Sequence, residues 1–253
     1  MEYRNLTEQE YKDLEGRILF EDNHLLIVCK KAGEIVQGDK TGDETLCDKY
    51  KAFIAIRNSK PGKVFLGIPH RLDRPVSGIT VFAKTSKALE RLSASFRDGQ
   101  VHKIYLALCI AAPKEPHALL ENWLIRKEAL NKSFITQEGR FKDAKLAKLI
   151  YTHIGDTDRY HLLQVELLTG RHHQIRCQLA GIGCIIKGDL KYGAPRSNSD
   201  GSICLHARSI TLPHPVTKEN ITLLAPVPST WKGVSALLQP HPASPGTNPA
   251  DSY

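Results

Sequence analysis

The sequence lacks any long hydrophobic run. Its longest apolar stretches, residues 25–29 and residues 104–112, fall well short of the roughly 20 residues that span a bilayer. The N-terminal residues, MEYRNLTEQE, are acidic and polar, whereas a signal peptide has a basic start followed by an apolar segment. We therefore expect no membrane partner and a cytoplasmic location.

Paired cysteines and cofactor motifs are also missing. The six cysteines form no C-x-x-C pair and no Cys/His spacing typical of a zinc site, so we expect reduced thiols. The chain has neither a G-x-G-x-x-G motif nor a P-loop. His70, His172 and His173 raise the question of a metal, but no third ligand accompanies them. We expect no metal and no cofactor.

The composition is that of an ordinary globular protein with a basic balance. With 253 residues, 41% of them hydrophobic, the chain can form one large α+β domain or two small ones. A net charge of +8 favours a polyanionic partner such as nucleic acid, although solubility alone could explain it.

Apolar periodicity predicts an alternation of strands and helices. The predicted strands span residues 18–22, 24–30, 64–68, 78–83, 101–110, 146–154 and 160–168. The predicted helices run from Thr85 and Ser86 to Gly99, and over residues 172–182. After the strand at residues 24–30, a loop with Gly33, Gly38 and Gly42 should be mobile. After Trp231 the chain becomes proline-rich, and we expect residues 239–253 to be disordered.

Basic residues gather in the segment from 126 to 148. They are interleaved with only three acidic residues and comprise Arg126, Lys127, Lys132, Arg140, Lys142, Lys145 and Lys148. They could contact phosphates, which would make binding sensitive to salt, or they could form a solvated face.

A single carboxylate stands out within residues 67–84, because Asp73 lies between Arg71 and Arg74 on a connection between two apolar runs. Such a group is either a structural ion pair or a positioned reactive group, and connections carry function more often than elements do. Beside a guanidinium it should stay ionised at neutral pH.

Two further patterns place polar groups where they need a partner. Arg176 shares a helical stripe with His172 and Leu179, and an unpaired charge on a buried stripe is costly, which makes Asp73 its candidate partner. The period of two around residue 104 puts Lys103 and Tyr105 on one face of a strand. Without further information Tyr105 could simply fill that face.

Six sequence blocks in a fixed order carry a family resemblance. They are residues 18–22 with Lys30-Lys31-Ala32-Gly33; His70-Arg71-Leu72-Asp73 with Ser77-Gly78 and Ala83-Lys84; Lys103-x-Tyr105; residues 168–176, LTGRHHQIR; Gly188-Asp189-x-x-Tyr192-Gly193; and Leu205-His206-Ala207. With these blocks the chain resembles the RluA-type pseudouridine synthases, which convert uridine in RNA to its C-glycoside isomer. The resemblance covers residues 17 to about 230.

The resemblance implies roles for individual residues. Asp73 is similar to the catalytic aspartate, Tyr105 to the tyrosine that stacks on the target base, and Arg176 to the arginine paired with the aspartate. Arg71 resembles the arginine that fills the space left by a flipped nucleotide. The substrate-binding residues expected on this basis are His70, Arg71, Lys103, His173 and Leu179.

The implied chemistry needs no cofactor. The N1–C1′ bond of uridine breaks, the uracil turns, and a C5–C1′ bond forms, without net oxidation or hydrolysis. Asp73 could attack C1′ or the uracil ring, or could remove the C2′ proton, and the sequence does not choose among these. The nucleotide must first be flipped out of its stack.

The resemblance also implies a fold and a partner. We expect an α+β fold in which residues 17–238 form a single pseudouridine synthase catalytic domain with a bent, mainly antiparallel mixed sheet flanked by helices. Residues 1–16 would be an N-terminal extension too short for an S4 RNA-binding domain. The expected partner is RNA, ribosomal or transfer, and the expected state is a monomer. The alternative is a catalytically inactive RNA-binding or RNA-chaperone protein of the same fold.

Overall fold

The fold is built on one long, bent sheet flanked by helices. The computed structural model describes residues 3–38, 42–59 and 62–239. The strands are β1 (Ile18–Glu21), β2 (Leu25–Lys30), β3 (Ser77–Ala83), β4 (His102–Cys109), β5 (His117–Lys127), β6 (Lys132–Thr136), β7 (Lys145–Asp156), β8 (His161–Leu167), β9 (Leu205–Pro213) and β10 (Asn220–Leu224). The helices are α1 (Glu8–Glu15), α2 (Leu46–Arg57), α3 (Ser86–Arg97), α4 (Gln174–Gly181) and α5 (Val234–Leu237), with short 3-10 turns at Glu128–Leu130 and Leu190–Tyr192.

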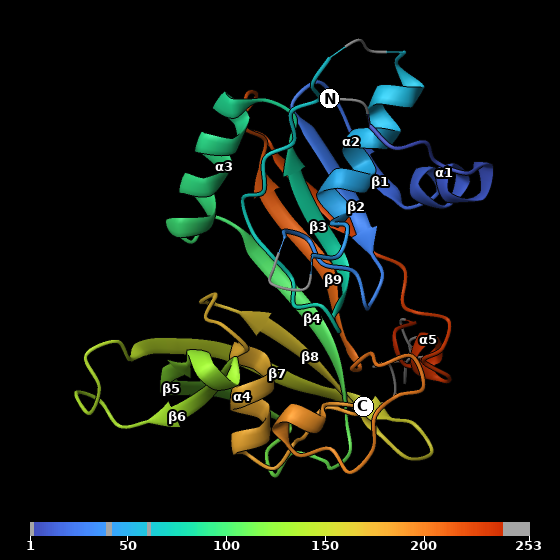
Figure 1. Cartoon of the computed structure of the whole chain (residues 1–253). Helices are drawn as coiled ribbons and strands as arrows, with labels where there is room; N and C mark the ends of the chain where they lie inside the picture. Colours follow the sequence, from blue (N-terminus) through green and yellow to red (C-terminus); the bar gives the residue numbers. More distant parts are fainter. Residues whose placement is uncertain (1–2, 39–41, 60–61, 240–253) are drawn as a thin grey trace, which may run out of the picture.

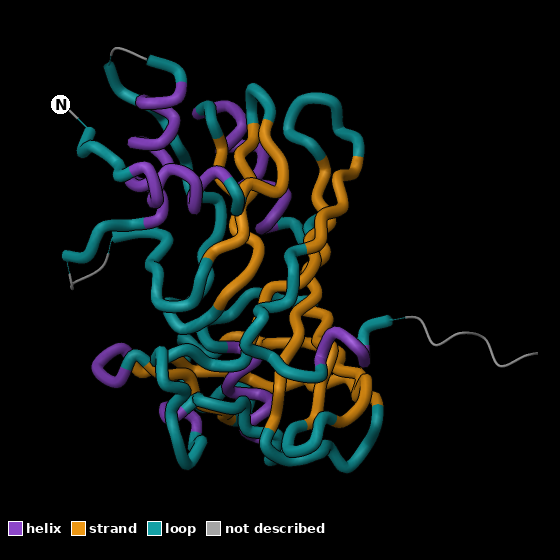
Figure 2. The backbone as a smooth tube through the Cα atoms, turned by 90° about the vertical axis from the view of Figure 1, so that its right-hand side faces the viewer, coloured by secondary structure: helices purple, strands orange, loops and turns teal. Residues whose placement is uncertain are grey.

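The strand order confirms the expected mixed sheet. It is β1-β2-β3-β9-β4-β8-β7-β5-β6, with β10 paired to residues 209–213 of β9, beyond the short β3–β9 ladder. Pairing is antiparallel throughout the described residues except between β3 and β9, which run parallel for two residue pairs. Figures 1 and 2 show an upper half around β1 to β3 and a lower half around β5 to β8, inclined to each other and joined through β4 and β9.

In the upper half, alternation along β2 builds two separate cores. Leu26 and Val28 pack with α2 on one face, whereas Leu25 and Ile27 join the core that includes Leu92 of α3 on the other. Because helices cover both faces of this part of the sheet, apolar residues follow one another without interruption from Leu25 to Cys29 of β2. The lower half is covered on one face by α4, which contacts β5 and β6 (Figure 1).

Most sequence-predicted elements are confirmed. The strands predicted near residues 18–30, 78–83, 101–110 and 146–168 correspond to β1, β2, β3, β4, β7 and β8, and the two predicted helices to α3 and α4. Helix α2 was missed because its buried residues, Leu46, Cys47, Tyr50, Ala52, Phe53 and Ile54, do not follow one narrow stripe. Its start is nonetheless marked by Thr45, whose hydroxyl accepts a hydrogen bond from the backbone N–H of Asp48 at 3.0 Å.

The strand predicted over residues 64–68 is wrong. Only Gly67 pairs with a strand, through a single bridge to Ala83. Phe65, which the pattern placed in a buried strand, is 45% exposed. Pro69 follows closely and has no backbone N–H to extend a ladder. The segment therefore runs as an extended loop that leads into residues 70–76.

Near its N-terminus the chain packs onto the upper half of the fold. Helix α1 packs against α2, and the Tyr50 hydroxyl donates a hydrogen bond to the Leu14 carbonyl at 2.9 Å. The segment expected to be a disordered tail lies outside the described residues, apart from Gln239. No helix in the described part of the chain is long and apolar enough to cross a membrane.

The junction of the two halves requires glycine at position 78. Gly78 has φ +115° and sits opposite Ala207 in the short parallel ladder, where a Cβ atom would lie 2.3 Å from the Ala207 carbonyl oxygen. We predict that Gly78→Ala lowers the free energy of unfolding by about 2 kcal/mol or more, measured by urea denaturation.

The matched control is Gly201→Ala, since Gly201 also has positive φ (+69°) but nothing within 4 Å of its added Cβ. It should cost about 1 kcal/mol. Equal effects of the two substitutions would show that the close approach to Ala207 is unimportant.

Candidate active site

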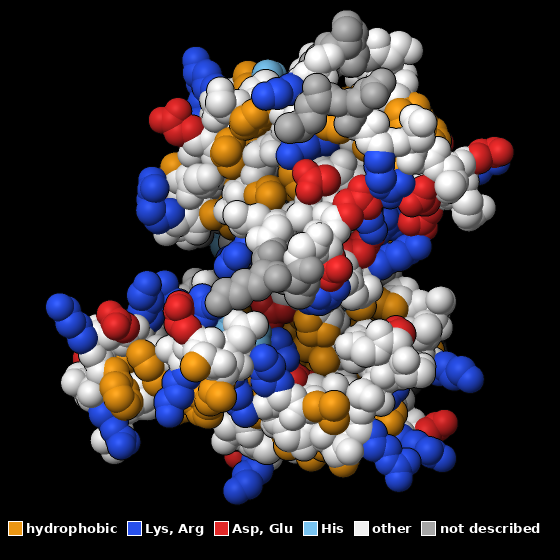
Figure 3. Space-filling view, in the orientation of Figure 1, with side chains coloured by type: hydrophobic (Ala, Val, Ile, Leu, Met, Phe, Trp, Pro, Cys, Tyr) orange, Lys and Arg blue, Asp and Glu red, His pale blue; other side chains and the backbone are white. Residues whose placement is uncertain are grey.

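A cleft of about 630 Å³ opens between the two halves of the sheet. Its walls come from residues 69–76 and α3 in the upper half, from β4, and from residues 167–176 in the lower half. Figure 3 shows the molecule indented between the halves. Basic side chains among the lining residues are Arg71, Arg97, Lys103, Arg126, Arg171 and Arg176. The cleft therefore suits a negatively charged ligand.

Asp73 lies in a loop whose backbone is held by a buried lysine. The Lys30 ammonium group donates to the carbonyls of Lys31, Arg74 and Val76 at 2.9, 3.1 and 2.6 Å. Lys30 is fully buried, and burial lowers its pKa to about 8. Three carbonyl acceptors replace its water shell and fix the turn around Asp73.

The carboxylate of Asp73 meets the distant Arg176, as the sequence suggested. Arg176 Nη1 lies 3.0 Å from Asp73 Oδ2. The larger share of the guanidinium, however, binds Asp189: Nε and Nη2 donate to its two carboxylate oxygens at 2.7 and 2.8 Å. This fork is the strong bidentate geometry of an arginine–carboxylate pair.

Burial distinguishes the two carboxylates. The side chain of Asp189 is 1% exposed and that of Asp73 is 30% exposed. Burial works against the charge of Arg176, yet its pKa is raised because Asp189, and then Asp73, stabilise the cation. One guanidinium thus neutralises the buried carboxylate and aims the exposed one into the cleft.

Sequence neighbours of Asp73 point elsewhere. Arg74 donates to the Gly33 carbonyl at 3.1 Å and pairs with Asp43. Arg71 is exposed and lines the cleft. Among the described residues Asp73 forms an ion pair with Arg176, and His173 Nε2 lies 3.4 Å from the same carboxylate oxygen. Arg71 is therefore available to a ligand.

His173 packs behind the aspartate as a neutral ring. It has φ +51° at the start of α4, is 8% exposed, and stacks on His172 with ring centroids 3.9 Å apart. Burial lowers its pKa to about 3, since the charged form is disfavoured inside the protein. Its Nε2 atom, 3.0 Å from Arg176 Nη1, then accepts, and Nδ1 faces the Tyr192 hydroxyl at 3.2 Å.

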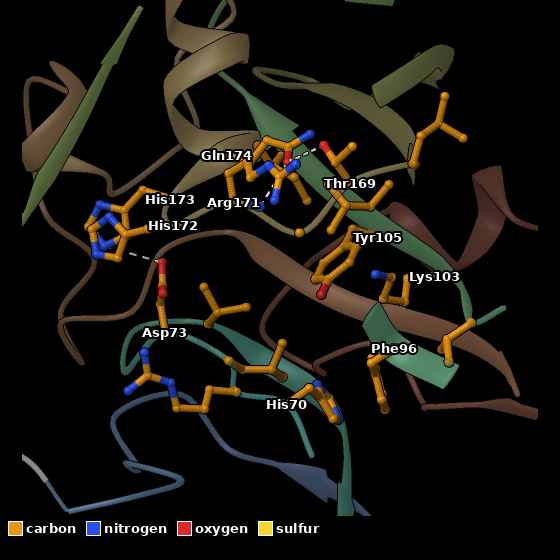
Figure 4. Close-up of a pocket in the computed structure, with 18 of the residues that line it drawn as sticks. His70, Asp73, Phe96, Lys103, Tyr105, Thr169, Arg171, His172, His173 and Gln174 are labelled. Atoms are coloured by element: carbon orange, nitrogen blue, oxygen red, sulfur yellow. Dashed lines mark hydrogen bonds and ion pairs between the residues drawn. The ribbon is translucent and has the colours of Figure 1, made fainter. Parts of the chain in front are cut away.

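On the opposite wall, Tyr105 and Lys103 face the cleft from β4 (Figure 4). Lys103 lies over Phe96, with Nζ 5.9 Å from the ring centroid. His70 stacks on the same Phe96 at 4.6 Å and accepts a hydrogen bond from the Val81 backbone N–H at 3.0 Å. His70 thereby ties its loop to β3.

Leu179 is a correction to the predicted substrate-binding set. Its side chain is fully buried in the lower core and is not among the cleft residues. Arg176 lies at the end of α4 that faces the cleft, whereas Leu179, about one helical turn later, lies in the core. The other seven predicted residues, His70, Arg71, Asp73, Lys103, Tyr105, His173 and Arg176, all line the cleft.

Three positioning residues were missed. Asp189 was visible only as part of the Gly188-Asp189 block, Lys30 as a lysine closing an apolar strand, and Phe96 as one apolar position of a helix. The spacing of these residues along the chain carries no sign of their contacts.

The buried Asp189–Arg176 pair leads to a stability prediction. Asp189→Asn should lower the free energy of unfolding by about 3 kcal/mol, because removing one partner leaves a buried charge poorly compensated. The measurement is urea unfolding, with the exposed Asp200→Asn as control. A loss equal to that of the control would contradict the structural importance of the pair.

Two buried histidines, His173 and His206, and the half-buried His70 predict a loss of stability in acid. Burial lowers the pKa of His70 and His173 to about 3 and that of His206 to about 4, below the ordinary value of 6.5. The unfolded chain therefore binds more protons as pH falls below 6.5, and stability falls with it. The expected slope is up to about 1.36 kcal/mol per pH unit for each histidine.

Urea unfolding between pH 7 and pH 5 would measure this slope. His70→Gln should reduce the slope by up to about 1.36 kcal/mol per pH unit, because one fewer proton is bound on unfolding. A free energy of unfolding that stays constant over this range would refute the assignment of neutral buried histidines.

Comparison with known proteins places this site in a family. Residues 24–181 match the model of the RNA pseudouridylate synthase family. The ribosomal large subunit pseudouridine synthase C of Vibrio vulnificus is 30% identical over 221 residues, which cover 85% of this chain and 67% of that protein. A Xenopus tropicalis protein named pseudouridylate synthase RPUSD4, mitochondrial, is 27% identical over 259 residues, covering 87% and 80% of the two chains.

A solved structure supports the same fold. Human RNA pseudouridylate synthase domain containing 4 superimposes with a TM-score of 0.74 at 24% identity, covering 87% of this chain and 92% of that one. Since the matched family model spans more than half of the sequence, the chain belongs to the RNA pseudouridylate synthase family, and its bacterial relatives place it among the RluA-type members.

Proposed function

We propose that this RNA pseudouridine synthase isomerises a uridine in ribosomal RNA, with Asp73 as the catalytic group. The observation that carries the proposal is the position of the Asp73 carboxylate. It is the exposed member of the Asp189–Arg176–Asp73 cluster and lies in the cleft, with Tyr105 lining the wall opposite (Figure 4).

The geometry suits a reaction at one ionised carboxylate. The N1–C1′ bond breaks, the uracil turns, and C5 joins C1′; the C5 proton is lost and N1 gains one, so the product is an isomer. Asp73 Oδ2 accepts a hydrogen bond from Arg176, which keeps the carboxylate oriented. An oriented carboxylate can act as a nucleophile at C1′ or on the ring, or as a base at C2′. All three roles place it against the same nucleotide.

The walls of the cleft suit a flipped nucleotide. Flipping costs a few kcal/mol of stacking. Stacking of the base on an aromatic side chain contributes about 1 to 3 kcal/mol, and Tyr105 is the aromatic residue that β4 presents there. Arg71 would enter the space that the nucleotide leaves, and Lys103 and Arg126 would meet phosphates along the cleft.

Ribosomal RNA is favoured as the substrate by the relatives' names. Several bacterial relatives are named ribosomal large subunit pseudouridine synthases. We further propose a monomer and a cytoplasmic location. The relative from Xenopus tropicalis is named mitochondrial, so cell fractionation should include organelles.

The central test is Asp73→Asn. We expect release of tritium from RNA labelled at uridine C5 to fall by about 10³-fold or more, because the reacting group itself is lost. RNA affinity, measured by filter binding at fixed salt, should change only a few-fold. Asp200→Asn, an exposed carboxylate far along the chain, is the control and should keep full activity. Substantial release by Asp73→Asn would remove Asp73 from the catalytic role.

The substrate is tested separately. Pseudouridines are mapped in ribosomal and transfer RNA from cells with and without the gene. Loss of one or a few ribosomal sites supports the proposal, and loss confined to transfer RNA overturns the ribosomal assignment. A protein that binds RNA but modifies none would be an inactive RNA-binding member of the fold.

A further inference from the structure

A second cluster of polar side chains lies outside the cleft, at the end of the β7–β8 hairpin. Asp156 Oδ1 is 2.8 Å from His153 Nε2 and 2.6 Å from His161 Nδ1. The three ligand atoms all lie within 4.8 Å of one another. None of the three residues lines the cleft or takes part in the reaction proposed above.

A β-bulge brings these residues together. In a regular strand, residues three apart point to opposite faces. The register between β7 and β8 shifts between His153 and Gly155, so one extra residue of β7 is accommodated there. His153 and Asp156 consequently share a side, and Asp156 pairs directly across the ladder with His161. The residue spacing in the sequence does not reveal this cluster.

The three side chains do not need one another as hydrogen-bond partners, because all of them reach solvent. The side chain of Asp156 is 56% exposed, and those of His153 and His161 are 21% and 27% exposed. Water could therefore serve all three. Instead, both imidazoles converge on the same carboxylate oxygen, which holds three potential ligands around one point.

We propose that His153, Asp156 and His161 form a binding site for a divalent transition cation of the zinc type. Two imidazole nitrogens and one carboxylate are ligands that Zn²⁺ and its neighbours accept, whereas Mg²⁺ and Ca²⁺ prefer sites made of oxygen alone. Three protein ligands leave a further position for water.

The geometry needs only a small adjustment. Ligand bonds of about 2.0 to 2.2 Å in a tetrahedron separate the ligand atoms by about 3.4 Å. His153 Nε2 and His161 Nδ1 now lie 2.8 and 2.6 Å from Asp156 Oδ1, so each distance must increase by less than about 1 Å. The side chains can do this by rotation because they are partly exposed.

The site would brace the hairpin where it meets α5. A Cβ atom built on Gly155 would lie 3.1 Å from the side chain of Leu237, which shows how closely α5 approaches the bulge. The hairpin turn and α5 lie beside each other in Figure 1. A bound cation would cross-link β7 to β8 at this point and raise the melting temperature.

Isothermal titration calorimetry of the tag-free full chain with ZnCl₂ tests the proposal. We expect one Zn²⁺ per chain, a higher melting temperature on addition of Zn²⁺, and no comparable binding of MgCl₂. Asp156→Ala and His161→Ala should each weaken Zn²⁺ binding at least tenfold, with circular dichroism confirming that both variants are folded. His117→Ala, which removes an exposed histidine bonded to Thr152 on β7, is the matched control and should bind like the wild type.

Several results would overturn the proposal. They are the absence of one-to-one binding by the wild type, unchanged binding by both Asp156→Ala and His161→Ala, or equal binding of Mg²⁺. Loss of binding in His172→Ala with retention in His161→Ala would instead place the cation at the cleft. None of these outcomes depends on pseudouridine synthase activity.

Discussion

The guanidinium of Arg176 is the group on which the active site depends. It lies on α4 in the lower half of the sheet, is 5% exposed, and reaches the carboxylate of Asp73 on a loop of the upper half. A cation at that depth needs full compensation, which Asp189 provides through two hydrogen bonds. The Nη1 group is then held toward Asp73 and His173, so the relative position of the two halves determines where Asp73 points.

Around this cluster, the protein stabilises charged and polar groups by giving each a defined role. Lys30 is buried but saturated by three carbonyls, and the buried His173 and the half-buried His70 are neutral rings that accept hydrogen bonds. These arrangements cost desolvation free energy, but they hold the loop around the Asp73 carboxylate in one conformation. The two histidines make the folded state sensitive to acid, because the unfolded chain binds their protons more readily.

Two β-bulges lie beside the proposed sites of this protein. The shift in the β4–β9 register lies next to Tyr105, at the wall of the cleft. The shift in the β7–β8 register assembles the cluster of His153, Asp156 and His161 at the other end of the lower half. Bulges re-aim side chains, and the β7–β8 bulge does so at the proposed cation site.

The sequence by itself determined most of the local elements and the pairing of Asp73 with Arg176. Period-two and helical patterns predicted β4, the β7–β8 hairpin, α3 and α4. Because an unpaired buried charge is costly, Arg176 needed a carboxylate partner, and Asp73 was the candidate. Only the tertiary structure decided that Asp189 holds most of that guanidinium, that Lys30 anchors the loop, and that Leu179 belongs to the core. It also turned the expected strand at residues 64–68 into a loop and revealed α2. The physical reason is that periodicity reports which way a side chain faces within its own element, whereas these outcomes depend on contacts between residues tens of positions apart, such as the 103 that separate Asp73 from Arg176.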